Sequence, residues 1–204
     1  MIYEVRTYDL KPGSLAQIEK AFEVAIPARE KYSPLAAFWH TEIGPLNQII
    51  HVWGYENLEE RERIRAEAIK DPDWPPKLDG NVLNMNSEIW NPAPFMRPLG
   101  GDQALGGIYE MRIYTFEPGS IPELIKRWTD ALPYREKFSP LAVGMSTEFG
   151  GLNRWMHVWP YKDLAERTKV RAEANKIPQW PAGAPGRVRQ ENKILVPSSF
   201  SPMH

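Results

Sequence analysis

Residues 2–14, IYEVRTYDLKPGS, return later in the chain as residues 108–120, IYEMRIYTFEPGS. The likeness runs at a constant offset of 106 through residues 2–75 and 108–181, where 38 of 74 positions are identical. REKYSPLA returns as REKFSPLA, and HVWGYENLEER returns as HVWPYKDLAER. A repeat of this length is a small domain, so the chain is a tandem duplication.

The chain length predicts that the two copies fold together. The 204 residues are 42% hydrophobic and 25% charged, which is typical of a globular protein. One copy alone would bury only roughly 60 to 65% of its unfolded surface, whereas the whole chain buries about 70%. We therefore expect two mutually stabilising domains, at residues 1–95 and 108–204, joined by a Gly-rich linker at residues 96–107.

Composition and charge exclude several classes of function. The net charge of −1 leaves no basic field that would hold nucleic acid, and the absence of Cys excludes disulfides and thiolate chemistry. No apolar run approaches the ~20 residues of a membrane span, so we expect no membrane partner. Because a strand pattern begins at Ile2, no room remains for a targeting peptide, and a cytoplasmic location is expected.

The residue pattern of the first copy predicts the element order βαββαβ. Strands are expected at residues 2–10, 36–43, 48–55 and 82–90, and helices at residues 15–32 and 58–70. Capping boxes are expected at Ser14 with Gln17 and at Asn57 with Glu60, the latter repeated by Asp163 with Glu166. Pro27 is expected to kink or restart the first helix.

This order defines an α+β fold of two tandem ferredoxin-like units. Two helices cover one face of each antiparallel sheet and leave the other face bare. The matching face of the second copy is the nearest cover for it. We therefore expect the two sheets to pack against each other as a barrel within one chain, with further homo-oligomers left open.

The repeated segments resemble the NIPSNAP family. The resemblance rests on the two opening strands, on HVWGYENLEER and HVWPYKDLAER, and on DPDWPP and IPQWPA after the second helix of each copy. It covers nearly all of both copies and implies the dimeric α+β barrel fold. Proteins that share this fold include cofactor-free monooxygenases, haem-degrading enzymes and small isomerases, while the family itself has no agreed catalytic activity. The family is associated with mitochondria in animals.

Strand alternation predicts which side chains share a face. Tyr3, Val5 and Thr7 form an apolar set that we expect to face the helices, which would send the intervening polar residues between the two sheets. The residues expected to line the barrel are Glu4, Arg6, Tyr8, Phe38, His40, Glu42, His51, Trp53, Tyr55, Glu110, Arg112, Tyr114, Gly144, Ser146, Glu148, His157, Trp159 and Tyr161.

These residues suggest a site for a small molecule. In the catalytic hypothesis His51 is the general base, His40 is a second proton-transfer group, and Arg6 with Tyr8 stabilises an oxyanion while Trp53 stacks on the ligand. In the structural alternative, Glu4 and Arg6 are an ion pair and the His and Trp side chains only pack. Tyr8 and Tyr114 would then satisfy Glu42 and Glu148.

The copies differ at one point on the predicted barrel wall. Phe38 and His40 become Gly144 and Ser146, so we expect a ligand in the room left by the smaller pair, with the first copy supplying the imidazoles. Substituting His40 or His51 should then weaken binding more than substituting His157. Drift after duplication, with the lost volume refilled by neighbours, is the alternative.

Neither a cofactor nor a metal is expected. The sequence has no phosphate-binding Gly loop, no GxSxG and no HExxH, although His40, Glu42 and His51 could converge on a metal in space. The sequence favours a small-molecule-binding barrel, in its stronger form a cofactor-free enzyme of the monooxygenase or isomerase type acting on a carbonyl or phenolic substrate. The alternative is a non-catalytic scaffold or protein-interaction module.

Overall fold

Each copy folds into four strands and two helices. The computed structural model describes residues 1–183 and 185–204. The first copy consists of β1 (Ile2–Leu10), α1 (Leu15–Glu30), β2 (Leu35–Ile43), β3 (Gln48–Tyr55), α2 (Leu58–Ala68) and β4 (Val82–Pro92). The second repeats this order as β5 (Ile108–Phe116), α3 (Ile121–Arg135), β6 (Val143–Phe149), β7 (Arg154–Tyr161), α4 (Leu164–Ala174) and β8 (Arg187–Pro197). The predicted βαββαβ order is confirmed in both copies.

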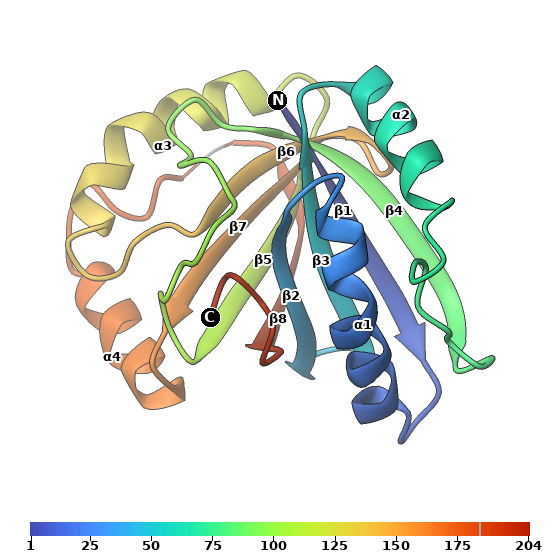
Figure 1. Ribbon diagram of the computed structural model, residues 1–204. Coiled ribbons are helices and arrows are strands. Elements are labelled where there is room, and N and C mark those ends of the chain that lie inside the picture. Colours follow the sequence, from blue (N-terminus) through green and yellow to red (C-terminus); the bar gives the residue numbers. More distant parts are fainter. Residues whose placement is uncertain (184) are drawn as a thin grey trace.

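The eight strands close into one barrel in the order β1-β3-β2-β8-β5-β7-β6-β4. Two seams join the copies: β2 pairs with β8 from Trp39 opposite Pro197, and β4 pairs with β6 at Ile89 opposite Phe149. The predicted intrachain barrel is therefore confirmed, and its sheets share hydrogen-bonded edges. Helices α1 and α2 cover one side of the barrel, and α3 and α4 cover the other (Figure 1).

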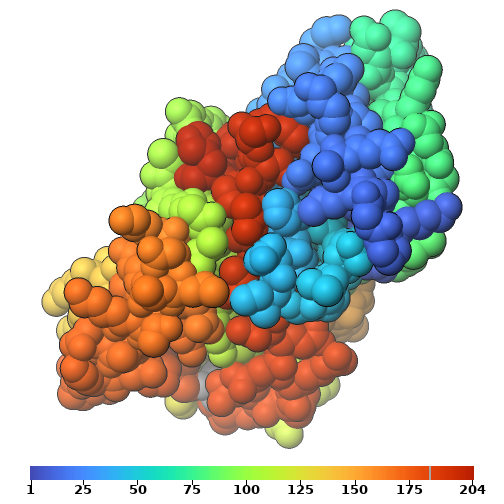
Figure 2. Space-filling view, turned by 90° about the horizontal axis from the view of Figure 1, so that it is seen from below, coloured from blue at the N-terminus to red at the C-terminus, as the bar shows by residue number. Residues whose placement is uncertain are grey.

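The end of each copy reaches across to the other. Phe95 packs on Trp155 of the second copy, and Phe200 packs on Phe38 of the first, with ring centroids 6.1 and 4.8 Å apart. The linker lies beside the C-terminal segment (Figure 2), where the amide nitrogen of Gln103 donates to the carbonyl of Pro202 at 2.7 Å. These exchanged contacts tie the two copies together.

The helix ends follow the sequence rules in part. The side chain of Asn57 accepts from the amide nitrogen of Glu60 at 2.9 Å, and Asp163 does the same for Glu166. The Ser14 capping box is wrong, because the Ser14 hydroxyl donates to the Lys11 carbonyl at 2.7 Å and makes no cap bond. The expected restart at Pro27 is also absent, since α1 runs through this residue to Glu30.

Most of the barrel interior is apolar, and here the sequence prediction was inverted. Tyr3 and Val5 pack inside the barrel with residues of both copies, such as Trp39, Tyr109 and Met111. The face that carries Tyr8, Trp53 and Tyr55 instead packs against α1 and α2. The closed middle of the barrel admits the apolar set, because polar groups there would lose water without gaining partners. At one end of the barrel Glu88 pairs with Arg154, and both line a cavity of about 300 Å³ together with Lys193.

The composition of the helices explains why the polar face of the sheet, and not the apolar face, packs against them. Helix α2 buries only Ile64 and Ala68, and α4 buries only Ala174. A helix with so few apolar residues cannot cover an apolar sheet face, but its arginines can pair with a polar one.

Among the described residues, no helix is long and apolar enough to cross a membrane.

Candidate functional site

A cavity of about 260 Å³ lies between the first-copy strands and their helices. Strands β1 and β3 form its floor, helices α1 and α2 form its sides, and the segment after α2 closes it with Trp74 and Pro75. Polar and aromatic side chains line it together. The lining residues are Arg6, Tyr8, Phe22, Arg29, His51, Trp53, Tyr55, Arg65, Ile69, Trp74, Pro75, Pro76, Leu78 and Met85.

The side chain of His51 lines this cavity, and a neighbouring side chain determines which of its ring nitrogens carries the proton. The indole nitrogen of Trp53 donates to Nδ1 of His51 at 2.7 Å. Burial, followed by the charge of Arg6, lowers the pKa of His51 to about 3, so the ring is neutral. Because an indole N–H can only donate, Nδ1 is the acceptor and the ring proton sits on Nε2. Nε2 is buried and has no acceptor among the described residues.

Glu4 is a buried carboxylate that binds several arginine side chains. Its carboxylate is fully buried and accepts from Arg6 at 2.8 Å, from Arg61 at 2.6 Å and from the Ser87 hydroxyl at 2.6 Å. Burial alone would raise the pKa of Glu4, but these hydrogen bonds and the charge of Arg65 lower it to about 2. Glu4 therefore remains ionised and positions arginines, which makes it a poor proton acceptor.

Arg29 reaches the same cavity from α1. Its guanidinium lies 4.5 Å from the centroid of the Trp53 ring and donates through Nη2 to the Tyr55 hydroxyl at 2.9 Å. The other terminal nitrogen, Nη1, is buried and has no acceptor among the described residues. Together with Nε2 of His51, the cavity therefore contains two buried donors that are free to bind an oxygen.

The Tyr8 hydroxyl is also oriented for a ligand. Nε of Arg6 donates to it at 2.8 Å, so the oxygen accepts from the protein side and its own hydrogen remains available. Arg6, Arg29, Arg61 and Arg65 surround the single carboxylate of Glu4. Such a positive field favours a ligand whose oxygen is, or becomes, negatively charged.

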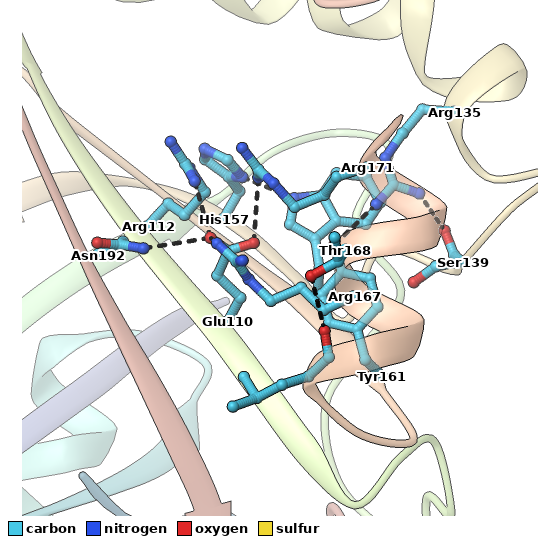
Figure 3. Close-up of polar contacts among 12 residues, drawn as sticks. Glu110, Arg112, Arg135, Ser139, His157, Tyr161, Arg167, Thr168, Arg171 and Asn192 are labelled. Carbon is cyan, nitrogen blue, oxygen red and sulfur yellow. Dashed lines mark hydrogen bonds and ion pairs between the residues drawn. The ribbon is translucent and has the colours of Figure 1, made fainter. Parts of the chain in front are cut away.

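The second copy builds the same arrangement independently. A cavity of about 250 Å³ is lined by Arg112, Tyr114, Arg135, His157, Trp159, Tyr161, Arg171, Ala174, Asn175, Trp180, Pro181 and Arg187. Trp159 donates to Nδ1 of His157 at 2.7 Å, and burial lowers the pKa of His157 well below its usual value. Glu110 accepts from Arg112, Arg167 and Arg171 (Figure 3), and these bonds overcome its burial to lower its pKa to about 2.

The structure brings most predicted site residues together, but in two places. Arg6, Tyr8, His51, Trp53 and Tyr55 line the first cavity, and their five equivalents line the second, each set under its own helices. Glu4 and Glu110 lie against these walls through their arginines. The expectation that the two sets face each other inside the barrel is therefore wrong.

Several predicted residues lie outside the cavities. His40 pairs through Nδ1 with Glu19 of α1 at 2.8 Å. Glu42 is exposed, and the exposed Glu148 accepts from Asn91 at 2.6 Å. Tyr8 and Tyr114 accept from Arg6 and Arg112, so they do not serve to satisfy these glutamates. Within residues 1–183 and 185–204, no group of three His, Asp or Glu is arranged to hold a metal ion.

The room expected beside Gly144 and Ser146 is filled. A Cβ atom on Gly144 would lie 3.0 Å from Leu141 and 3.3 Å from Trp155. Trp155 stands where the first copy has Ile49, and Trp128 where it has Phe22, so bulk lost at one position returns at two others. The proposed ligand space at this point is therefore wrong, and the refilled alternative is correct.

Sequence reasoning missed four pairs of residues. Arg29 with Arg135 and Trp74 with Trp180 line the cavities, while Arg61 with Arg167 and Arg65 with Arg171 bind the buried glutamates. The charges of helix 58–70 alternate in sign, a pattern typical of a solvated face, so charge alone does not mark its arginines as ligands of a buried carboxylate. The available signal was identity between the copies, since all four pairs are unchanged at the offset of 106.

Comparison with known proteins agrees with the fold. The NIPSNAP family model matches residues 3–97 and 109–202. Human "Protein NipSnap homolog 3A" is 28% identical over 218 residues, which cover 100% of this chain and 86% of the relative. "Protein NipSnap" of Drosophila melanogaster is 25% identical over 214 residues, covering 99% and 78%.

Solved structures with this architecture span nearly the whole chain. A candidate monooxygenase from Fusobacterium nucleatum has a TM-score of 0.66 at 12% identity, covering 96% of this chain and 91% of its own. One from Lactobacillus acidophilus has a TM-score of 0.65 at 10% identity, covering 96% and 92%. These likenesses concern the fold alone. Because the family model matches both copies over almost their full length, the chain belongs to the NIPSNAP family.

Proposed function

We propose that this chain binds small organic molecules through a carbonyl or phenolic oxygen, and that the first-copy cavity is the binding site. The observation that carries the proposal is the buried Nε2–H of His51, which lines the cavity and has no acceptor among the described residues. Buried donors without a partner are rare in native proteins and cost roughly 1 to 3 kcal/mol each. A ligand oxygen at this nitrogen would recover that cost.

The lining indicates how such a molecule would lie. Tyr8 and His51 offer hydrogens on one wall, and Nη1 of Arg29 offers another buried donor. Phe22, Trp74 and Leu78 provide the apolar remainder of the cavity. A volume of about 260 Å³ lies just below the ~300 Å³ lower bound of drug-sized sites, so the ligand is a compact molecule, such as a single ring.

The chemistry supported by these groups is stabilisation of negative charge on oxygen. When a phenol or enol gives its proton to solvent water, the anion gains the field of the arginines and the donor on His51. A positive group within about 4 to 6 Å lowers the pKa of an acid by about 1 to 3 units. A cofactor-free enzyme acting on a carbonyl or phenolic substrate would use this effect to form an enolate or phenolate.

The role of His51 in this proposal differs from that expected from sequence. A general base needs a free lone pair, but Nδ1 of His51 already accepts from Trp53 and Nε2 carries the ring proton. We therefore assign His51 to hydrogen-bond donation, as an oxyanion-stabilising group. Trp53 keeps a place in the cavity wall, although Arg29 covers one of its faces. His40 has no part, because it lies outside the lining.

The alternative of a non-catalytic scaffold is favoured by a different observation. The middle of the barrel is packed with buried apolar side chains of both copies, such as Trp39, Tyr109 and Leu195, and the space predicted beside Gly144 is filled. A scaffold needs the barrel but has no use for the helix-side cavities. Ligand binding at His51 therefore distinguishes the two functions.

The test uses 4-nitrophenol, whose anion absorbs visible light. We expect saturable binding and an increase in the anion at constant pH, equivalent to a pKa lowered by about one unit. The His51→Phe variant keeps an aromatic ring of similar size and should lose both effects. His157→Phe makes the same change in the other cavity and serves as the matched control. Binding that is absent, or equally reduced in both variants, would contradict the proposal.

A further inference from the structure

The two cavities share their polar framework, but several surrounding positions differ, among them those of Val82 and Ile69. The sheet register places Val82 opposite Leu10 and Arg187 opposite Phe116, so Arg187 stands where the first copy has Val82. At the offset of 106, Asn175 takes the place of Ile69. Both changes replace an apolar side chain by a polar one in the second copy.

The change alters the chemical character of the second cavity. Phe22, Ile69, Leu78 and Met85 line the first cavity, whereas no Phe, Ile, Leu or Met is among the lining residues of the second. Four arginines line the second cavity, compared with three in the first. The carboxylate that pairs with these arginines is Glu110 in the second copy and Glu4 in the first.

Arg187 adds a positive charge to the rim of the second cavity. Its guanidinium lies 5.4 Å from the centroid of the Tyr114 ring, and that of Arg112 lies 5.4 Å from the same ring. Arg112 and Arg171 are held by Glu110 (Figure 3), but no ion pair formed by residues 1–183 and 185–204 includes Arg187. Arg187 is exposed at the cavity rim, where an incoming anion meets it first.

A second donor lies deeper on the same wall. Nε2 of His157 is buried, has no acceptor among the described residues, and carries the ring proton because Trp159 donates to Nδ1. The cavity thus has an unpaired guanidinium at its mouth and an unpaired N–H at its inner wall. A tetrahedral anion has several oxygens and can offer a separate one to each donor.

We propose that the second cavity binds a small dianion of the phosphate monoester class, whereas the first binds the neutral or singly charged oxygen ligand described above. This inference rests on the proposed function, since it assumes that helix-side cavities are ligand sites. The duplication permits it, because a symmetric homodimer of one copy would carry two identical cavities. Here each cavity has its own Glu, His and Trp, so the rim residues can differ freely.

The test measures the binding of phenyl phosphate by calorimetry to the full chain. We expect one site per chain in the unmodified protein. Arg187→Val introduces the residue of the first copy and should weaken binding roughly tenfold, the effect of one charge-assisted contact. Arg189→Val is the matched control, because Arg189 lies on the same strand, is exposed, and pairs with Glu191 away from the cavity. It should change binding less than about twofold.

A reciprocal variant tests the same idea by gain of function. The double substitution Val82→Arg and Ile69→Asn gives the first cavity the polar residues of the second, and should raise the number of phenyl phosphate sites from one to two. His157→Phe should remove the original site and His51→Phe should not. Arg187, Arg189 and Ile69 are exposed and Val82 is half-buried, so the substitutions at these four positions lie outside the fully buried core.

The outcomes separate this inference from the proposed function. If 4-nitrophenol binds at His51 but phenyl phosphate does not bind, or Arg187→Val and Arg189→Val weaken it equally, the second-cavity inference is wrong and the proposed function stands. If phenyl phosphate is lost in His51→Phe and kept in His157→Phe, the inference is wrong as well. If neither probe binds, both are wrong.

Discussion

Trp53 donates its indole hydrogen to Nδ1 of His51 at 2.7 Å, and Trp159 does the same to His157 at 2.7 Å. Each pair lies two residues apart on one face of a strand, so the bond follows from the strand geometry. It determines which nitrogen carries the imidazole proton, and that protonated nitrogen is a buried donor of a residue that lines the cavity. The repeated segments HVWGY and HVWPY thus encode a donor rather than a base.

The first prediction concerns these two imidazoles. In ¹⁵N-histidine-labelled protein, His51 and His157 should both show an unprotonated Nδ1 and a protonated Nε2 at neutral pH. Neither should titrate near 6.5, the usual pKa of histidine, because burial lowers both values. A resonance of either residue that shifts with a midpoint near 6.5 would contradict the assignment.

A second prediction follows for stability against pH. The pKa of His51 is about 3 in the folded chain and about 6.5 in the unfolded chain, so below pH 6.5 the unfolded state binds more protons. Folding stability is therefore fully present above that pH and falls as the pH drops toward 3. Each histidine of this kind lowers the free energy of unfolding by about 1.4 kcal/mol for each unit that the pH falls below 6.5. Urea unfolding of the wild type and of His51→Phe/His157→Phe between pH 7 and 5 measures it, and the double variant should have the flatter profile.

The third prediction concerns the buried glutamates. Glu4→Gln removes the anion that holds Arg6 and Arg61, and leaves two guanidinium groups facing each other near a buried amide. Breaking a buried ion pair from one side costs about 3 to 5 kcal/mol. Glu42→Gln, at an exposed position, should stay within about 0.5 kcal/mol of wild type. Equal free energies of unfolding for the two variants would show that Glu4 does not organise the arginines.

A fourth prediction concerns the repacking of the second copy. A side chain at Gly144 would collide with Leu141 and Trp155, so Gly144→Phe should be strongly destabilising. The double substitution Gly144→Phe and Trp155→Ile installs the pairing found in the first copy. It should recover part of the lost free energy of unfolding, since the two sites share one volume. Purely additive effects would mean that their volumes are not coupled.

The duplication and the strand pattern were enough to predict most of the fold. β3 was predicted with its observed limits, Gln48–Tyr55, because strand alternation is bounded there by turn residues. The closed barrel was predictable because each sheet has a face that its helices leave uncovered. What period-two alternation cannot provide is which of two faces points inward. The inward face is decided by the side chains that pack against each face of the sheet. Helix α2 presents arginines to the sheet, whereas the prediction assumed an apolar helix face.

The sequence predicted which residues form the site better than it predicted where the site lies in the fold. Arg6 and Tyr8 of β1 and His51 and Trp53 of β3 were identified by strand alternation, and they do line one cavity. Arg29 lies 22 residues before His51 in the sequence, in a helix, so only the fold reveals that it contacts Trp53. A contact between a helix and a distant strand leaves no pattern in a single sequence. The signal that was available is that Arg29 is repeated as Arg135 in the second copy.

The central claim is that Nε2–H of His51 donates to the oxygen of a bound ligand. Its most direct test is to titrate ¹⁵N-histidine-labelled protein with 4-nitrophenol and follow the Nε2–H resonance of each buried histidine. We predict that the proton of His51 moves downfield with a saturable dependence on ligand, while that of His157 changes little. Saturable binding that leaves the His51 resonance unmoved would contradict the claim.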